Sequence, residues 1–540
     1  MTGPNGLSQD SGGNAGETRV DLRNSAVLLG LFVPTLIGFY LLLTSTTSLI
    51  PGIRPYDAKR ILQFGLLVVL FLVPALNGRI RGEFGALLST VPGWLKATLL
   101  AIFCWGVISA LINAQSLMHV LNSLSEVALL SSLVLGVFVV AACRSITGRI
   151  FDRVAIGMIA LTGFTVGLQE LLGIAAAHGA SVAFNFEVSL LHFSHPRFYN
   201  QIQSWIVPAL VALPILIARS RMAVILWLLV LGLQWGIILM TGARGSFISI
   251  GAALIFSVVF LPPVRTTLIK WQVAGLTIGA VIFALVMFSF ERGNQVSATG
   301  TNPQTQHRSI EREVDRDVRT GRLPGGESSF FRQSLGRPLG HTSGRIAIWR
   351  SIIEDVRRHP LTGIGPMNYV CTSQKRIGHP HNFPLQLAAE WGIPVALAVG
   401  FIFLYLLLRI SQSIRQKAFS SPEDTTFAGL LFTGVLAAAL HACLSGVMVM
   451  PASQVTGLLI CGMLLGLYTS APGERLVPVL QWDFIPGLLL AVGLLGLGVH
   501  ELQTMKSRVE LLEPGASMWP RVWQDAKVCT LYNLQNEVKN

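Results

Sequence analysis

Two histidines in a polar stretch are the side chains of this chain best suited to proton transfer. His379 and His381 lie two residues apart within residues 343–394, while most of the chain is apolar. A histidine titrates near neutrality, so a neutral His381 can take a proton from a hydroxyl nucleophile. We therefore predict that His381 is a general base. A metal shared by both histidines is the alternative, but the absence of a nearby carboxylate pair disfavours a hard metal.

Arginine supplies nearly all the positive charge around these histidines. Residues 291–390 contain thirteen Arg and a single Lys. The planar guanidinium engages phosphate oxygens with two N–H groups, whereas an ammonium acts as a point charge. This bias predicts a phosphate or pyrophosphate ligand, with Arg345 among its contacts. For the cluster 308–322 we expect solvated salt bridges instead, because residues 291–390 also contain nine acidic residues.

Two further stretches carry candidate ligand contacts. Arg244 lies in the short connection MTGARGS between apolar spans, where flanking glycines let the backbone approach a ligand. The alternative is an arginine that snorkels from a helix end. The run HFSHPRFYNQ supplies Arg197 and Asn200, which can hold an acceptor or a sugar through hydrogen bonds. Anchoring of this run at the membrane interface by Phe198 and Tyr199 fits it equally well.

The elements that position His381 follow from local patterns. Residues 345–358 have the spacing of an amphipathic helix, which Pro360 ends. Asn382 is expected to cap a short helix over 383–391, closed by Gly392. The predicted apolar face of the first helix is Ile346, Trp349, Ile353 and Val356.

Glu390, in the short helix, either orients His381 or faces water beside the membrane. Glu170 and His441 lie inside apolar spans, where burial is costly. Each marks either a pathway or a polar contact between helices. Cys371 and Cys529 can both face an oxidising compartment, and a disulfide between them is left open.

Composition places the chain in a membrane. It has 540 residues, of which 52% are apolar and 12% charged, and its apolar runs are long enough to cross a bilayer. We predict an all-α polytopic membrane protein with about 12–13 transmembrane helices. The thirteen predicted spans are 27–47, 61–78, 97–113, 126–143, 154–176, 202–218, 222–241, 246–262, 273–290, 393–409, 426–448, 454–470 and 484–500.

Charge gives the orientation. With the N-terminus inside, the inner segments carry sixteen Lys and Arg and the short outer loops carry five. The net charge of +13 lies mainly between spans, which argues against nucleic-acid binding. The predicted parts are a disordered cytoplasmic tail (1–25), nine helices (26–290), a large outer catalytic loop (291–392), four helices (393–500) and an outer tail (501–540).

The arrangement resembles the signature region of the O-antigen ligase and O-antigen polymerase superfamily. The matching features are Arg345 and Trp349 on one helix, the turn PLTGIG over 360–365, and the pair His381-Asn382. Gly392 has the expected spacing, while Val395 stands where the ligase pattern prefers Gly, Thr or Tyr. The MTGARGS stretch resembles a Thr-x-Ser-Arg-Gly motif with Ala243 in place of Ser. The resemblance covers 237–250 and 343–400, and elsewhere only the hydropathy.

The resemblance implies a membrane glycosyltransferase on the periplasmic side of a bacterial inner membrane. The donor would be a glycan on undecaprenyl pyrophosphate, and the acceptor a lipid A-core sugar. The implied catalytic residues are His381, Arg345 and Arg244, in an inverting reaction without metal or cofactor. Together with the residue chemistry above, this gives Arg197, Asn200, His379, Asn382, Trp349 and Glu390 as the predicted substrate-binding residues.

Other functions remain open at this point. Polysaccharide polymerases and protein O-oligosaccharyltransferases share these motifs. A transporter of lipid-linked sugars is the alternative from another class. Such transporters tend to show repeated halves, whereas here no repeat is visible and the polar residues concentrate in one outer loop.

Overall fold

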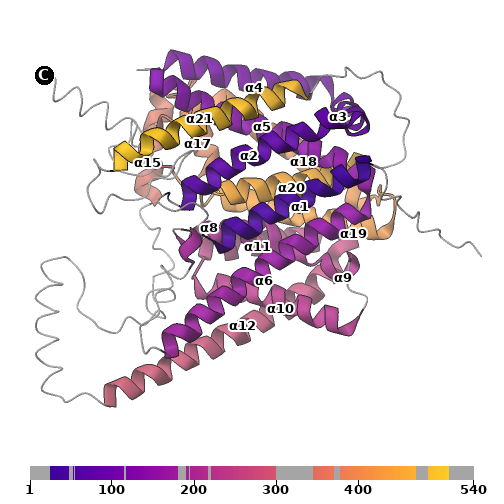
Figure 1. The fold of residues 1–540 in the computed structure, drawn as a ribbon, viewed down its shortest axis with the longest axis vertical. Coiled ribbons are helices and arrows are strands. Elements are labelled where there is room, and N and C mark those ends of the chain that lie inside the picture. Colours follow the sequence, from indigo (N-terminus) through magenta and orange to yellow (C-terminus); the bar gives the residue numbers. More distant parts are fainter. Residues whose placement is uncertain are drawn as a thin grey trace, which may run out of the picture.

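The computed structural model describes residues 25–47, 53, 55–114, 117–179, 190–193, 195–216, 220–299, 345–369, 378–469 and 484–509. In these residues the chain forms helices and no strands, so the all-α prediction is confirmed (Figure 1). The helices are α1 (Ser25–Thr46), α2 (Pro55–Leu76), α3 (Gly78–Thr90), α4 (Gly93–Ile112), α5 (Leu117–Thr147), α6 (Arg149–Gly179), η1 (Leu191–Phe193), α8 (Pro196–Leu210), α9 (Leu213–Leu216), α10 (Arg221–Met240), α11 (Arg244–Phe260), α12 (Pro262–Thr299), α15 (Arg345–Arg358), α17 (Phe383–Glu390), α18 (Ile393–Arg415), α19 (Pro422–Ala442), α20 (Pro451–Thr469) and α21 (Ile485–Val509).

Every predicted span overlaps a helix, and one of them is broken. Ten helices of the described chain are long and apolar enough to cross a membrane, and α11 and the first part of α21 are shorter apolar helices. The span predicted over 202–218 divides into α8 and α9. Pro208 and Pro214 account for the break, because proline lacks an N–H and disfavours the helical conformation in the residue before it. α12 continues to Thr299, beyond the predicted end of its span.

The helix α3 was not predicted. Its sequence lies within a connection expected to be a loop between the second and third spans. Asn77 starts the helix, since its side chain accepts hydrogen bonds from the backbone amides of Arg79 and Ile80. Ile80, Phe84 and Leu87 bury one side of α3. It is a short helix that packs against α5 and α2.

The helix α8 runs through the core and carries buried polar side chains. Tyr199 is fully buried, and its hydroxyl donates to Gln234 Oε1 at 2.8 Å. Anchoring of Tyr199 at the membrane interface is therefore wrong. Gln203 also donates to Gln234 Oε1, at 3.1 Å. Such pairing between helices satisfies polar groups that burial removes from water.

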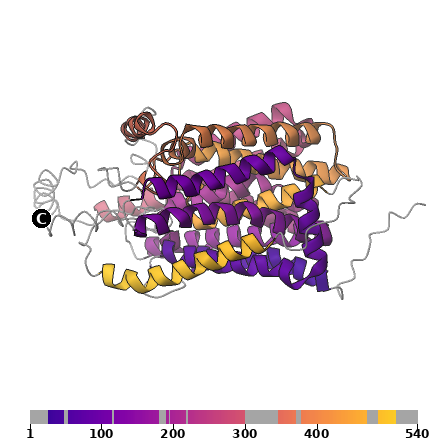
Figure 2. The ribbon, with the colours of Figure 1, turned by 90° about the horizontal axis from the view of Figure 1, so that it is seen from above.

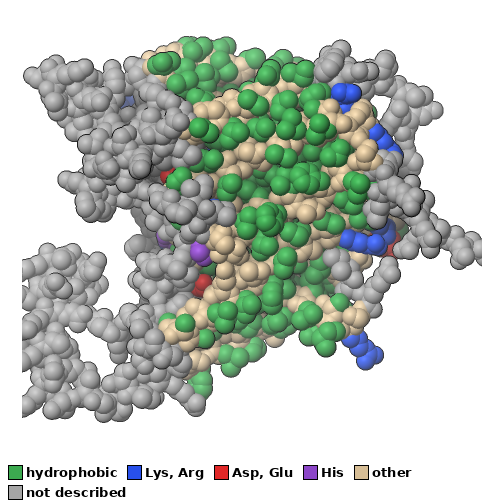
Figure 3. Space-filling model, in the orientation of Figure 1, with side chains coloured by type: hydrophobic (Ala, Val, Ile, Leu, Met, Phe, Trp, Pro, Cys, Tyr) green, Lys and Arg blue, Asp and Glu red, His purple; other side chains and the backbone are tan. Residues whose placement is uncertain are grey.

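The connections predicted to be inside meet at one end of the bundle. Arg144 forms a buried ion pair with Asp152 at 3.0 Å, and Arg149 reaches Asp424 at 3.4 Å. Arg153 donates to the carbonyl of Leu216 at 3.0 Å. Figure 3 shows Lys and Arg gathered at this edge, while histidine is visible toward the opposite edge. α15 and α17 lie at that opposite end (Figure 2). The grouping agrees with the charge count, and the compartment that each end faces stays a prediction.

Candidate functional site

The amphipathic helix α15 packs on α17 through a face different from the predicted one. Ile348 and Ile352 are buried, together with Ile364 and Ala389. Ile346 and Ile353, assigned to the apolar face, are 46% and 39% exposed. Trp349 and Val356, also assigned to the apolar face, are partly buried. The helix is amphipathic as predicted, but the face that packs against α17 is centred on Ile348 and Ile352, and not on Ile346 and Ile353.

A glycine turn joins α15 to the end of α17. Gly363, Gly365 and Gly392 have φ of +66°, +95° and +90°, a region that side chains rarely adopt. The amide of Gly365 donates to the carbonyl of Glu390 at 3.0 Å, and that of Ile393 to Pro360 at 2.8 Å. A Cβ on Gly392 would lie 1.9 Å from the carbonyl oxygen of Leu361. The turn predicted from these glycines is thus present and closely packed.

His381 lies at the end of a constrained segment just before α17. Its φ is +56°, which is unusual for a residue with a side chain, and its amide donates to His379 Nδ1 at 3.2 Å. The two imidazole rings are 4.2 Å apart between centroids. Trp349 donates its Nε1–H to the carbonyl of Pro380 at 3.0 Å. Asn382 accepts from the Leu385 amide at 3.0 Å, which confirms the predicted cap.

Positive charge converges on His381. The pKa of His381 is lowered to about 4, first by burial and then by the charges of Arg345, Arg197 and His195 in that order. Burial, and then the charge of Arg197, also lowers the pKa of Arg345. His381 Nδ1 is buried and has no hydrogen-bond partner within the described residues. The structure therefore joins Arg197, Arg345 and His381 in one electropositive region that favours an anionic ligand.

Arg244 begins α11 directly after a turn, and the first residues of α11 pack on the end of α19. Gly242 in the turn has a φ of +56°. A Cβ on Gly245 of α11 would lie 3.3 Å from His441 Nε2, so the start of α11 and α19 are in close contact. Ser204 Oγ of α8 lies 2.7 Å from His441 Nδ1, and Ser246 Oγ lies 3.5 Å from Nε2. Of the two roles left open for His441, the structure shows the polar contact between helices.

The end of α19 also contacts the histidine segment. A Cβ on Gly446 would lie 2.6 Å from His379 Cε1, so the buried His379 ring lies directly on that glycine. Residues 441–446 therefore contact the start of α11 beside Arg244 and the segment that carries His381. Ser204 of α8 also reaches this region through His441, so three segments far apart in sequence meet around these six residues.

Two amides of α8 present buried oxygens without partners. Asn200 donates to Gln203 Oε1 at 2.8 Å and to Thr241 Oγ1 at 3.0 Å. Gln201 donates to Ser445 Oγ at 3.0 Å. Asn200 Oδ1 and Gln201 Oε1 are both buried and accept no hydrogen bond in the part of the chain that is described. An unpaired buried acceptor is costly, which suits a ligand that donates hydroxyl protons.

A comparison with protein families identifies the segment that carries these motifs. Residues 225–400 match the family described as O-antigen ligase. Over this range, about a third of the chain, the sequence is similar to the O-antigen ligase family. Members of this family are membrane glycosyltransferase-like enzymes. No curated protein matches the chain. The matched range includes Arg244, Arg345 and His381, whereas α8 with Arg197 and Asn200 precedes it.

Glu390 has a structural place in this ligase-family segment. Its side chain is fully buried and accepts from the Tyr369 amide and from Gln386 Nε2, both at 3.2 Å. The interpretation that it faces water is therefore wrong. These contacts hold the end of the glycine turn against α17.

The ligase-family motifs did not reveal every residue of the site. His195 accepts from the Arg197 amide at 3.0 Å and begins α8. Its pKa is lowered to about 4, first by burial and then by the charge of Arg197. The run HFSHPRFYNQ contains His195 and Gln201, and only its density of polar groups between apolar spans signalled them. Ser204 gave no signal, because only the tertiary contact with His441 distinguishes it. Cys371 and Cys529 lie outside the described residues.

Proposed function

We propose that this protein is an O-antigen ligase-like glycosyltransferase that moves a glycan from a polyprenyl pyrophosphate to an acceptor hydroxyl. The observation that carries the proposal is the convergence of Arg345 and Arg197 on the buried, unpaired His381. A neutral base surrounded by guanidinium groups suits an anionic donor and a hydroxyl nucleophile. The matched family supports a lipid-linked glycan donor and a glycan acceptor in general.

The proposed reaction is a single displacement at the anomeric carbon. His381 accepts the proton of the acceptor hydroxyl while the acceptor oxygen bonds to the anomeric carbon. The bond from that carbon to the pyrophosphate oxygen breaks, and the polyprenyl pyrophosphate leaves with the bonding electrons. Arg345 and Arg244 compensate its charge through paired N–H groups. Attack opposite the leaving group inverts the anomeric configuration.

The acceptor site is proposed to lie along α8. Asn200 Oδ1 and Gln201 Oε1 accept hydrogen bonds from sugar hydroxyls, since both oxygens are buried without a partner in the described chain. Arg197, which is exposed at the start of α8, precedes these amides on the same helix, and its charge acts on His381. We propose lipid A-core as the acceptor and the periplasmic face of the bacterial inner membrane as the place of reaction.

Reconstitution tests this function and separates the acceptors. The purified protein in liposomes receives a polyprenyl-pyrophosphate glycan together with lipid A-core, a free glycan or a peptide. We expect glycan on lipid A-core, detected by mass spectrometry, and none with the Arg345→Ala variant. Transfer to the free glycan or to the peptide alone would identify a polymerase or a protein oligosaccharyltransferase. Movement of intact donor across the bilayer without transfer would contradict the proposal.

A further inference from the structure

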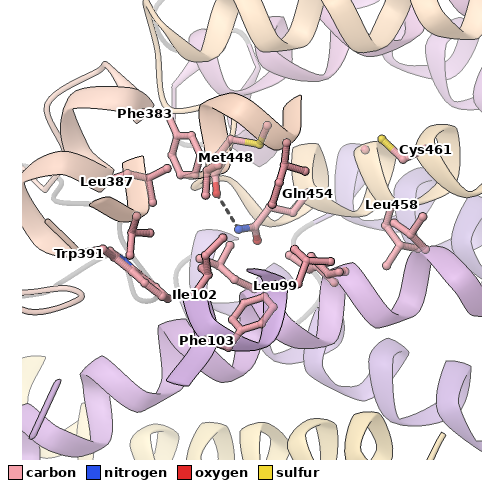
Figure 4. Close-up of a pocket in the computed structure, with 18 of the residues that line it drawn as sticks. Leu99, Ile102, Phe103, Phe383, Leu387, Trp391, Met448, Gln454, Leu458 and Cys461 are labelled. Atoms are coloured by element: carbon pink, nitrogen blue, oxygen red, sulfur yellow. Dashed lines mark hydrogen bonds between the residues drawn. The ribbon is translucent and has the colours of Figure 1, made fainter. Parts of the chain in front are cut away.

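An apolar cavity of about 320 Å³ lies beside the histidine segment, between α4, α5, α17, α18 and α20. Figure 4 shows Phe383, Leu387 and Trp391 from the α17 side and Leu99, Ile102 and Phe103 from α4. Gln454 is the one polar side chain among the described residues that line it. Its amide is already paired, since it donates to the Met448 carbonyl at 2.7 Å and accepts from Gln63 at 3.1 Å. The cavity therefore offers no polar partner to water and suits an apolar ligand.

Only single helices separate this cavity from the surrounding lipid on two sides. On α18, Val399 and Ile402 line the cavity, while Leu397 and Phe401 on the other face are 68% and 60% exposed. α4 has the same division, with Ile102 inside and Leu100 66% exposed. An apolar chain in the bilayer thus reaches the cavity by passing one helix.

The cavity extends from the level of the reaction site into the membrane part of the bundle. Ser109 of α4 donates to the carbonyl of Thr362 in the glycine turn at 2.7 Å, so this part of α4 lies at the same depth as the turn beside the reaction site. Leu99, which also lines the cavity, precedes Ser109 by ten residues in α4 and so lies about 15 Å from it at a rise of 1.5 Å per residue. At the end of the cavity nearest the glycine turn the wall includes Phe383, which follows His381 by two positions. A ligand chain in the cavity therefore begins next to the proposed base.

We infer that this cavity holds the isoprenoid segment of the donor nearest its pyrophosphate. The inference rests on the proposed function. In the donor the reacting carbon, the pyrophosphate and the first isoprene units are joined by consecutive bonds, so the chain must leave the site within a few ångströms of it. In a lipid A-core acceptor, by contrast, the core sugars separate the reacting hydroxyl from the acyl chains. An apolar cavity adjoining His381 fits the donor chain.

Kinetics with two donors tests the inference. One donor carries the full polyprenyl chain and the other a methyl group, with the same glycan and pyrophosphate. Val399→Phe and Cys461→Phe fill the cavity from opposite walls, and Leu397→Phe, on the lipid-facing side of α18, is the matched control. We expect each filling variant to raise the KM for the polyprenyl donor about tenfold, because two or so methylene groups lose their burial. The KM for the methyl donor and both KM values of the control should not change.

A binding measurement separates this inference from the function itself. A polyprenyl pyrophosphate with a photoreactive group near its pyrophosphate should crosslink to peptides of α4, α17 or α18 in the wild type, and not in the filling variants. Crosslinking without any glycan transfer would overturn the proposed function and support the site. Transfer with an unchanged donor KM in both folded filling variants would overturn the site. A raised KM for the acceptor alone would overturn it too, by assigning the cavity to the acceptor's acyl chains.

Discussion

The indole of Trp349 holds the backbone between the two histidines, because its Nε1–H donates to the carbonyl of Pro380 at 3.0 Å. His379 and His381 lie on either side of that carbonyl, and His381 adopts a φ of +56°. α15 therefore positions the proposed base as well as supplying Arg345. The family pattern predicts that this tryptophan binds substrate, and in the structure it makes this backbone contact.

Loss of this hydrogen bond should slow transfer more than it weakens donor binding. Trp349→Phe keeps an aromatic ring on α15 and removes the donor, which costs about 1 kcal/mol of stability. We expect kcat to fall roughly ten- to hundredfold, since a misplaced base loses alignment, with little change in the donor KM. Trp94→Phe on α4, 42% exposed, is the control. Equal kcat values for both variants would contradict a positioning role.

The two arginines assigned to the pyrophosphate should not tolerate lysine. Arg244→Lys and Arg345→Lys keep the charge and lose the paired N–H geometry, so we expect transfer to fall more than tenfold in each. Arg358→Lys is the matched control on α15, because that side chain is 67% exposed and pairs with Glu354 at 3.2 Å. Initial rates at equal amounts of folded protein measure the difference. Near-normal transfer by both site variants would refute the pyrophosphate clamp.

Local signals predicted the parts of the site that neighbouring residues determine. The Asn382 cap and the turn at Gly363 depend on conformational preferences over a few residues, and both are present. The buried face of α15 could not be predicted in the same way. Its apolar residues form two adjacent stripes, and contact with Ile364 and Ala389 selects the stripe with Ile348 and Ile352.

Long-range contacts were beyond the sequence patterns. Ser204 and His441 are 237 positions apart, and nothing in either neighbourhood specifies that they meet. The run before α8 was equally ambiguous, because its aromatic and polar residues fit a membrane interface as well as a core. Tyr199 is buried and hydrogen-bonded to Gln234, which shows that this residue belongs to the core. Assembly of the site thus depends on how the helices pack.

The glycine before α18 should be required for folding of the whole segment. Gly392→Ala places a methyl group 1.9 Å from the Leu361 carbonyl oxygen at a φ of +90°, so we expect a loss of at least ~2 kcal/mol in the free energy of unfolding. Gly400→Ala on the same helix meets nothing within 4 Å and should gain up to ~1 kcal/mol. Thermal unfolding in detergent compares the two. Equal midpoints would show that the turn relaxes without cost.

The charge count predicts which end of the bundle faces outward. His359, exposed after α15, belongs to the outer end, and Ser413, near the end of α18, belongs to the inner one. In a cysteine-free background, a cysteine at position 359 should react with an impermeant thiol reagent in intact spheroplasts, and one at position 413 should react only after lysis. The reverse pattern would invert the topology and remove the donor from the proposed side.

The pH dependence of transfer should identify His381 as the base. A base must be neutral, and the lowered pKa of about 4 keeps the imidazole neutral down to mildly acidic pH. We therefore expect kcat/KM, which reports the free enzyme, to stay level as the pH falls through 6.5, the unperturbed value, and to decline only near pH 4. Bound pyrophosphate favours the imidazolium, so the decline in kcat should lie at higher pH than the decline in kcat/KM.

Substitutions at the two histidines complete this test. His381→Ala should abolish transfer and retain donor binding, because the donor contacts are assigned to arginine. His379→Ala should be milder, because His379 does not itself take the proton. Its Nδ1 accepts a hydrogen bond from the His381 amide and so only orients the base. Chelators should leave the wild type active. Among the described residues no three His, Cys, Asp or Glu side chains come together as a metal site. Equal inactivity of both variants together with inhibition by chelators would replace the base by a metal. An active His381→Ala would leave catalysis to the arginines alone, because charge compensation of the leaving pyrophosphate would then suffice without a base.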